Sequence, residues 1–151
     1  MNDDLTIRSA QRSDIGGMSD LLSQLFVIES DFTPDEHKQK LGLELLLSTP
    51  YSCAVVAEDP SGVIGMATVQ TLVSTAEGGR VGLVEDVVVD RHHRGKGIGG
   101  ALLEYLQVWA KDNSLSRLQL ATDSGNDEAV KFYEKIGWEQ TSLMLLRLGG
   151  R

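Results

Sequence analysis

The chemically most suggestive segment of the chain is a glycine-rich loop flanked by cationic side chains. Residues 87–100 read Val-Val-Val-Asp-Arg-His-His-Arg-Gly-Lys-Gly-Ile-Gly-Gly. Glycine lets a ligand approach the backbone closely, and the free N–H groups where a helix begins bind phosphate. Arg91, Arg94 and Lys96 add positive charge beside these glycines. The segment therefore predicts a site for an anionic ligand that carries a diphosphate.

Two well-known phosphate-binding loops fit this segment poorly. A P-loop requires Lys and then Ser or Thr after its last glycine, whereas Gly100 is followed by Ala101. The dinucleotide-binding fingerprint matches the spacing of Gly95, Gly97 and Gly100. However, Arg91-His92-His93-Arg94 separates the preceding strand from the first glycine, and too few residues follow for the remaining βαβ units. We therefore disfavour both alternatives.

The elements that must position this loop are a strand before it and a helix after it. Residues 81–89 are predicted to form the strand, and residues 98–109 show the apolar spacing of an amphipathic helix. Four further strands are predicted at residues 5–8, 51–58, 63–73 and 117–122, with a flexible stretch at 74–79 and one or two strands at 138–148. Helices are predicted to begin at Ser13-Asp14, at Thr33-Pro34 and at Asp127. In the second of these helices Leu41, Leu45 and Leu46 should face inward.

The overall composition restricts the partners that the chain can have. It has 151 residues, with 14 Lys and Arg against 22 Asp and Glu, and a formal net charge of -8. This balance argues against docking on nucleic acid or on anionic membranes. No apolar run could span a bilayer, and the acidic start at residues 1–4 is unlike a signal peptide. Because Cys53 is the single cysteine, no internal disulfide or cysteine-based metal site can form. We expect residues 1–151 to form one domain in the cytoplasm.

Three ordered segments resemble the GNAT superfamily of N-acyltransferases, which use acyl-CoA. Arg94-x-x-Gly97-x-Gly99 matches the family signature of Arg or Gln, two residues, Gly, one residue, and Gly or Ala. Residues 85–90 resemble the strand before that loop, and residues 126–138 resemble the family's Asn…Phe-Tyr-x-x-x-Gly-Phe segment, with Trp138 as the last aromatic residue. The resemblance implies an α/β fold with a mixed, mostly antiparallel sheet of about six or seven strands and about four flanking helices.

The resemblance further implies that acetyl-CoA is the acyl donor, bound over residues 81–137, with helices at about 14–48 on the acceptor side. Its pyrophosphate would lie on the loop and its pantetheine arm along the strand. A main-chain N–H, that of Val87, would polarise the thioester carbonyl. The implied cofactor-binding residues are Val87, Val88, Val89, Arg94, Gly95, Lys96, Gly97, Ile98, Gly99, Gly100 and Asn126.

Tyr133 and Glu85 are the candidate catalytic residues. The family often has a tyrosine at the position of Tyr133 that protonates the departing thiolate, which suits a phenol with a pKa of about 10. The alternative for Tyr133 is packing against the cofactor. Glu85 would accept the proton of the acceptor ammonium group, directly or through water. Strand alternation places Glu85 on the face of Val87 and Val89, and Asp86 on the other face unless a bulge intervenes. The alternative for Glu85 is a solvated charge at the strand end.

Several other polar residues are expected to have no catalytic part. Direct attack by the acceptor needs no enzyme nucleophile, so Cys53 is interpreted as a buried structural thiol. His37, His92 and His93 are expected at the surface. The first two helices carry acidic residues that could attract a cationic amine or simply form a solvated cluster: Glu29, Asp31, Asp35 and Glu36.

These observations predict an N-acetyltransferase that transfers acetyl from acetyl-CoA to a primary amine of a small molecule or peptide. The alternative from another class is a non-catalytic acyl-CoA-binding or sensing domain with the same fold. Neither function needs a metal, a nucleic acid or a membrane. Many members of the superfamily pair, so a homodimer is also expected from the resemblance.

Overall fold

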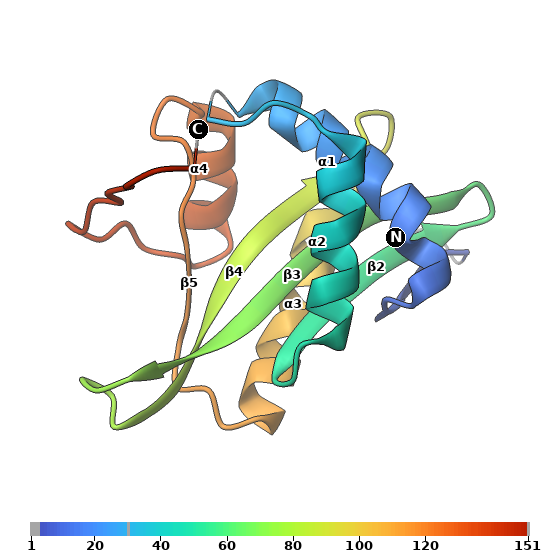
Figure 1. Ribbon diagram of the computed structural model, residues 1–151. Coiled ribbons are helices and arrows are strands. Elements are labelled where there is room, and N and C mark those ends of the chain that lie inside the picture. The colour runs from blue at the N-terminus through green and yellow to red at the C-terminus, as the bar shows by residue number, and fades with distance from the viewer. Residues whose placement is uncertain (1–3, 30, 151) are drawn as a thin grey trace. The chain divides into compact units, whose positions relative to one another are not determined.

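The computed structural model describes residues 4–29 and 31–150 (Figure 1). Residues 1–3, which belong to the segment compared above with a signal peptide, lie outside the described residues. The chain divides into two compact units, Met1–Leu120 and Ala121–Arg151, and each is described by itself. None of the described helices is both long and apolar enough to cross a membrane.

A five-stranded sheet forms the centre of the first unit. Its strands, in spatial order, are β1 (Thr6–Ser9), β2 (Ser52–Asp59), β3 (Gly62–Ser74), β4 (Gly79–Val89) and β5 (Leu118–Leu120). Neighbours are antiparallel except β4 and β5, which run parallel. The sheet is therefore mixed and mostly antiparallel, as predicted, and this order excludes the doubly wound parallel sheet of a dinucleotide-binding fold.

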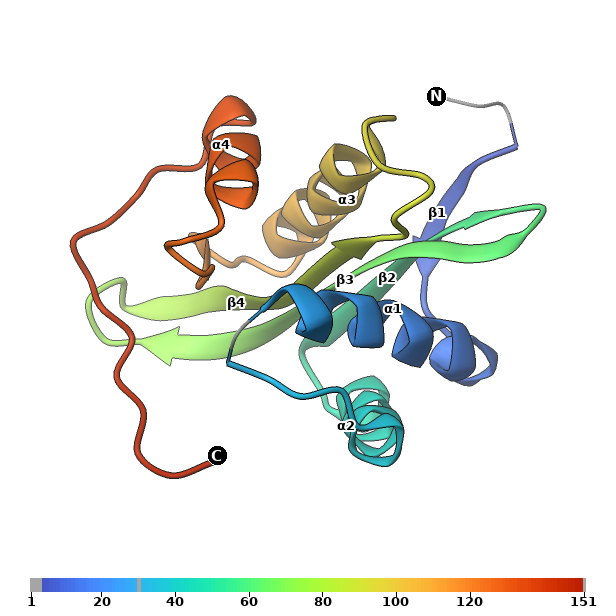
Figure 2. The same ribbon diagram turned by 90° about the horizontal axis from the view of Figure 1, so that it is seen from above.

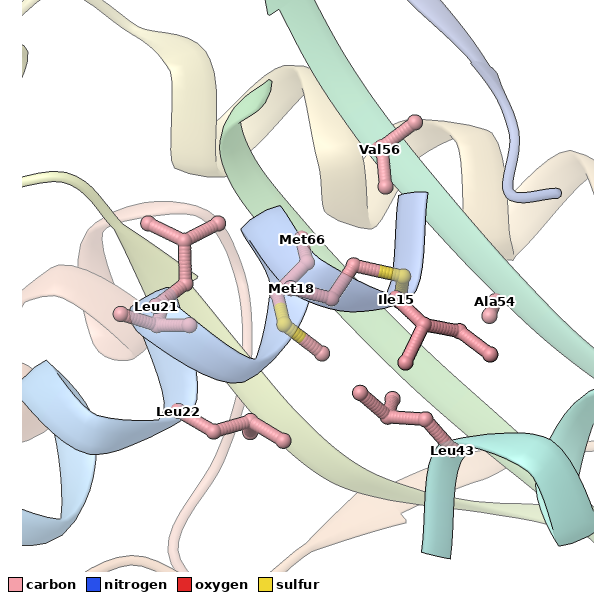
Figure 3. Close-up of a cluster of buried hydrophobic side chains, with 9 residues drawn as sticks. Ile15, Met18, Leu21, Leu22, Leu43, Ala54, Val56 and Met66 are labelled. Carbon is pink, nitrogen blue, oxygen red and sulfur yellow. The ribbon is translucent and has the colours of Figure 1, made fainter. Parts of the chain in front are cut away.

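Three helices of the first unit cover the two faces of this sheet. A short 3-10 helix, η1 (Arg12–Asp14), leads into α1 (Ile15–Ile28), and α2 (Glu36–Ser48) follows. Helices α1 and α2 lie on one face, and α3 (Ile98–Asp112) lies on the other (Figure 2). Figure 3 shows apolar side chains of α1 and α2 directed toward the strands, in a buried cluster that includes Ile15, Met18, Leu21, Leu22, Leu43, Ala54, Val56 and Met66.

The start and the buried face of α2 differ from the prediction. The helix is capped by Asp35, whose Oδ1 accepts a hydrogen bond from the N–H of Lys38, and not by Thr33. Leu41 and Leu45 are exposed by 48% and 70%, so the expectation that they face inward is wrong. The buried Gln39 determines the face instead, because its amide donates to Ser19 and Ser23 of α1. Leu43, one turn later, is buried.

Both hairpins of the sheet close with tight turns. The turn between β2 and β3 lies at residues 60–61, as the sequence predicted. The stretch at residues 74–79, expected to be flexible, is instead a turn, since Ser74 pairs with Gly79 at the ends of β3 and β4. Gly78 in this turn has a φ of 67°, a value that glycine adopts readily.

The second unit contains one helix, α4 (Asp127–Lys135), which completes the expected four helices. The one or two strands expected at residues 138–148 are absent from the described part of the chain, so the prediction of six or seven strands is wrong. A strand with one buried face needs alternating apolar and polar residues and a partner. Here four apolar residues follow one another, each at least 71% exposed: Leu143, Met144, Leu145 and Leu146.

Candidate functional site

The glycine loop lies between β4 and α3, as the sequence predicted. Gly95 and Gly97 have φ values of 77° and 80°, a region that strains any residue with a Cβ. Gly97 is the N-cap of α3, so the unpaired N–H groups and the positive dipole end of the helix begin at the loop. Ile98 is buried and anchors the helix, while residues 94–97 are exposed. The exposed backbone is suited to binding an anion.

Cationic side chains surround this backbone. Arg91, Arg94 and Lys96 are all exposed. The Nε of Arg94 donates a 3.1 Å hydrogen bond to the carbonyl oxygen of Val89, which directs its side chain back toward the end of β4. Of the loop residues predicted to bind the cofactor, 94–97 thus form an exposed turn with local positive charge, and 98–100 form the first turn of α3.

A β-bulge interrupts β4 just before the loop. Val84 pairs with Val69 and Val87 pairs with Ala67, so two residues of β4 lie opposite Thr68 alone. The two paired valines share one face of the sheet, and the two residues between them therefore lie on the other face. The expectation that Glu85 shares a face with Val87 and Val89 is wrong, because alternation assumes a regular strand.

The second bulge residue, Asp86, is held by a buried hydroxyl. Thr68 is fully buried; its Oγ1 donates to Asp86 Oδ2 at 3.0 Å and accepts from the Asp86 N–H at 3.2 Å. Burial raises the pKa of Asp86 to about 6, the Thr68 hydrogen bond opposes this rise, and the charge of Glu85 adds to it. Glu85 itself is exposed. This pair was not predicted from the sequence, although the threonine within the apolar stretch of β3 is a signal for it.

Asp86→Asn should stabilise the protein at pH 8 but not at pH 4. The pKa of Asp86 in the folded state lies above its ordinary value of 3.8, so its favourable contribution is complete below that value and is lost as the pH rises through about 6. Asparagine resembles the protonated acid and can still accept from Thr68. We expect a gain of about 1–3 kcal/mol in the free energy of unfolding at pH 8, measured by denaturant titration.

The exposed neighbour provides the control for this prediction. Glu85→Gln should change the free energy of unfolding by less than about 0.5 kcal/mol at either pH, as expected for a surface substitution. A loss of stability in Asp86→Asn at pH 8 would show that the fold favours the ionised carboxylate.

One edge of β4 has no strand partner beside the bulge. β5 pairs only with Gly82, Leu83 and Val84. Among residues 4–29 and 31–150, no strand continues this pairing along residues 85–89. Val88 packs into the core under α1, whereas Val87 and Val89 are only half-buried. The structure therefore leaves backbone groups of Val87 and Val89 at a place where an extended ligand can pair with them.

Tyr133 and Asn126 lie in the second unit. The Tyr133 ring is half-buried, with centroids 5.1 Å from Phe132 and 5.8 Å from Trp138. Asn126 is the N-cap of α4, and its Oδ1 accepts from the N–H of Ala129 at 3.2 Å. Asn126 therefore caps α4, and the cofactor contacts of both residues stay predictions.

The cysteine and the three histidines differ in their exposure to solvent. Cys53 is buried, which raises the pKa of its thiol to about 11 and confirms a structural part. His37 and His92 are exposed, as expected. The expectation for His93 is wrong, because its ring is half-buried between the carboxylates of Asp90 and Asp59.

The acidic residues near α2 have local partners. Asp35 caps the helix, and Glu36 forms an (i, i+4) ion pair with Lys40 at 2.6 Å. These contacts support the interpretation of a solvated helix-end cluster for Asp35 and Glu36. In the part of the chain that the structure describes, no three His, Cys, Asp or Glu side chains are grouped so as to hold a metal ion.

Comparison with known proteins finds similar sequences and structures among acetyltransferases. A family model described as the acetyltransferase (GNAT) family matches residues 18–138. The uncharacterized N-acetyltransferase YhfO of Bacillus subtilis (strain 168) is 30% identical over 139 residues, which cover 90% of this chain and 91% of that protein. The thialysine N-epsilon-acetyltransferase of Bos taurus is 28% identical over 144 residues, which cover 87% and 82%. The solved structure of the aminoglycoside N-acetyltransferase AAC(6')-Iy in complex with CoA shares the fold, with a TM-score of 0.84, 17% identity, and coverage of 99% of this chain and 97% of that chain.

The matched residues 18–138 include β4, the glycine loop, α3 and α4. They therefore contain every residue that the sequence analysis selected for the site. The chain belongs to the GNAT family of acetyltransferases.

Proposed function

We propose that this protein is a single-domain N-acetyltransferase that transfers the acetyl group of acetyl-CoA directly to a primary amine. The observation that carries this proposal is the exposed loop at residues 94–97, which has positive φ values at Gly95 and Gly97 and opens into the N-terminus of α3. Such a backbone binds a diphosphate through N–H groups and the helix dipole. Acetyl-CoA supplies the activated acetyl group, so the chain needs no nucleophile of its own.

The donor site extends from the loop along β4. Backbone N–H groups from Arg94 to Gly99 hold the pyrophosphate, with the charges of Arg94 and Lys96 beside them. The unpaired edge at residues 87–89 accepts the pantetheine arm as an added strand. The N–H of Val87 donates to the thioester carbonyl oxygen and stabilises the negative charge that develops there. Asn126, whose Oδ1 caps α4, keeps its NH₂ group to donate to a pantetheine amide.

Two side chains move protons in this mechanism. Glu85 accepts the proton of the acceptor ammonium group, directly or through water, and its exposure makes it accessible to both. Tyr133 protonates the departing thiolate. The pKa of Asp86, the neighbour of Glu85 in the bulge, is raised to about 6 by burial, so this carboxyl keeps its proton to a higher pH than an ordinary aspartate.

The acceptor is a primary amine of a small molecule or a peptide. Support comes from the relative named thialysine N-epsilon-acetyltransferase, whose name specifies an amino group. Helices α1 and α2, within residues 14–48, form the acceptor side. The net charge of -8 favours the approach of a cationic amine over an anionic one.

The cofactor assignment is tested by thermal unfolding with acetyl-CoA. Binding to the folded state alone raises the melting temperature as ligand concentration increases. We expect a concentration-dependent rise with acetyl-CoA and with CoA, and a smaller rise with pantetheine, which lacks the pyrophosphate. No rise at millimolar acetyl-CoA would refute the assignment. A non-catalytic acyl-CoA sensor gives the same shift, and turnover with an amine separates the two functions.

A further inference from the structure

A hydrogen-bond network holds the first turn of the glycine loop. Asp90 directly follows β4, and its N–H donates to the Ile64 carbonyl oxygen at 2.8 Å. Its Oδ1 accepts from Gln24 Nε2 at 2.9 Å. Its Oδ2 accepts from the N–H of His92 at 3.0 Å and from Nδ1 of His93 at 2.8 Å. One carboxylate thus binds three donors, two of which belong to the loop.

Gln24 of α1 completes this arrangement with both ends of its amide. While Nε2 donates to Asp90, Oε1 accepts from the N–H of Arg91 at 3.1 Å. An amide has donors at one end and an acceptor at the other, so these two bonds fix its orientation. Gln24 therefore connects the loop to α1, because its NH₂ group bonds to a carboxylate and its oxygen to a backbone N–H group.

His93 connects the same carboxylate to the β2–β3 hairpin. Its Nε2 lies 3.4 Å from Oδ2 of Asp59, the last residue of β2. The side chains of His93 and Asp90 are exposed by only 24% and 19%. The hydrogen bond from Gln24, and then that from His93, lowers the pKa of Asp90 to about 2. Asp90 is therefore ionised at neutral pH, when hydrogen bonds to it are strongest.

We propose that Gln24 and Asp90 are positioning residues for acetyl-CoA binding: together they fix the backbone at residues 90–93 and so direct residues 94–97 toward the pyrophosphate. This proposal rests on the proposed function, because it concerns the affinity of the loop for acetyl-CoA. It also gives α1 a part in the donor site. Neither residue touches the reacting atoms.

A reciprocal exchange of the two polar groups tests the pair. In Asp90→Asn, the one remaining oxygen can accept either from Gln24 or from the N–H of His92, so the NH₂ group on the other side faces a donor. If Gln24 flips to accept from that NH₂ group, the NH₂ of Gln24 faces the N–H of Arg91. In Gln24→Glu, two carboxylates face each other. In the double variant, the carboxylate introduced on α1 accepts from the amide introduced after β4 and from the N–H of Arg91, so every donor again has an acceptor. The substitutions change little volume, and the double variant also keeps the net charge of the wild type, so the comparison of the double variant with the wild type isolates hydrogen bonding.

The readout is the dissociation constant of acetyl-CoA, measured by calorimetry well below each melting temperature. Each single variant should weaken binding by about 10-fold or more, the loss expected when a charged hydrogen bond is broken. The double variant should bind within about 3-fold of the wild type, because the coupling restores the bonds. Arg8→Met is the control: it removes the bonds of Arg8 to Asp14 and Glu58, so it should lower the melting temperature and leave the affinity unchanged.

Three results would overturn the proposal. The single variants could bind as tightly as the wild type, their effects could add in the double variant, or affinity could follow melting temperature in all variants including Arg8→Met. In each case the wild type still binds acetyl-CoA, so the proposed function survives. If the wild type itself does not bind acetyl-CoA, the proposed function fails and this proposal fails with it.

Discussion

Replacing Gly97 by valine should weaken acetyl-CoA binding by about 100-fold or more and abolish detectable turnover. Gly97 has a φ of 80°, and an added Cβ would meet no neighbour within 4 Å, so the effect comes from the backbone and not from a clash within the protein. A β-branched residue in this region is strained by about 1–3 kcal/mol. The loop relieves that strain by turning its N–H groups away from the pyrophosphate. Calorimetric titration with acetyl-CoA measures the loss.

Gly78→Val is the matched control for this variant. Gly78 has a φ of 67°, and an added Cβ there also has no neighbour within 4 Å, but it lies in the β3–β4 turn. The two substitutions should therefore lower the melting temperature by similar amounts, whereas only Gly97→Val should weaken the binding of acetyl-CoA. Wild-type affinity in Gly97→Val would show that the loop does not hold the diphosphate through its backbone.

Tyr133→Phe should lower the catalytic rate by about 100-fold to 10,000-fold and leave acetyl-CoA affinity within about 2-fold of the wild type, because only the acid is removed. The ring packing against Phe132 and Trp138 is retained in phenylalanine, and the melting temperature of the variant checks that the fold is kept. Comparison of kcat with the dissociation constant of acetyl-CoA separates the two effects.

Tyr105→Phe provides the control for Tyr133→Phe. Tyr105 is a half-buried tyrosine of α3 outside the proposed machinery, so its variant should keep the wild-type rate. If Tyr133→Phe keeps the full rate as well, the hydroxyl of Tyr133 transfers no proton and the residue serves in packing. Acceptor-dependent rates over a pH series would then have to identify another acid.

The glycine loop could be predicted from the sequence because its determinants are local. Two positive-φ glycines, the preceding valine run and the amphipathic helix lie within one short segment, and each has a specific structural preference. The same holds for the cap of α4 by Asn126 and for the tight turn after Asp59. Local patterns therefore placed the loop correctly between β4 and α3.

The features that the sequence analysis missed depend on contacts between distant segments. The bulge at Glu85 and Asp86 arises because both residues lie opposite Thr68 on β3. The alternation of apolar and polar residues along one strand does not show how that strand pairs with its neighbour. The half-buried position of His93 depends in part on Asp59, which lies 34 positions earlier in the chain. The buried face of α2 depends on the bonds of Gln39 to α1. Each of these outcomes requires tertiary structure.

The predicted strands at residues 138–148 failed for a different reason. Leu143, Met144 and Leu145 follow one another without alternating polar residues, so no strand register places one face inside and the other outside. Composition without periodicity is consistent with a strand and does not specify one. The one or two strands predicted here were part of the expected six or seven, a number that the described residues do not reach.

The most direct test of the proposed activity is acceptor-dependent release of CoA thiol. Purified protein, acetyl-CoA and a panel of primary amines (polyamines, aminoglycosides, amino sugars, free lysine and lysine-containing peptides) are assayed for thiol release, and the acetylated amine is identified by mass spectrometry. We predict that at least one amine accelerates thiol release in proportion to enzyme and gains one acetyl group, and that Gly97→Val is inactive in the same assay. Binding of acetyl-CoA with no acceleration by any amine would contradict catalysis and favour an acyl-CoA-binding domain.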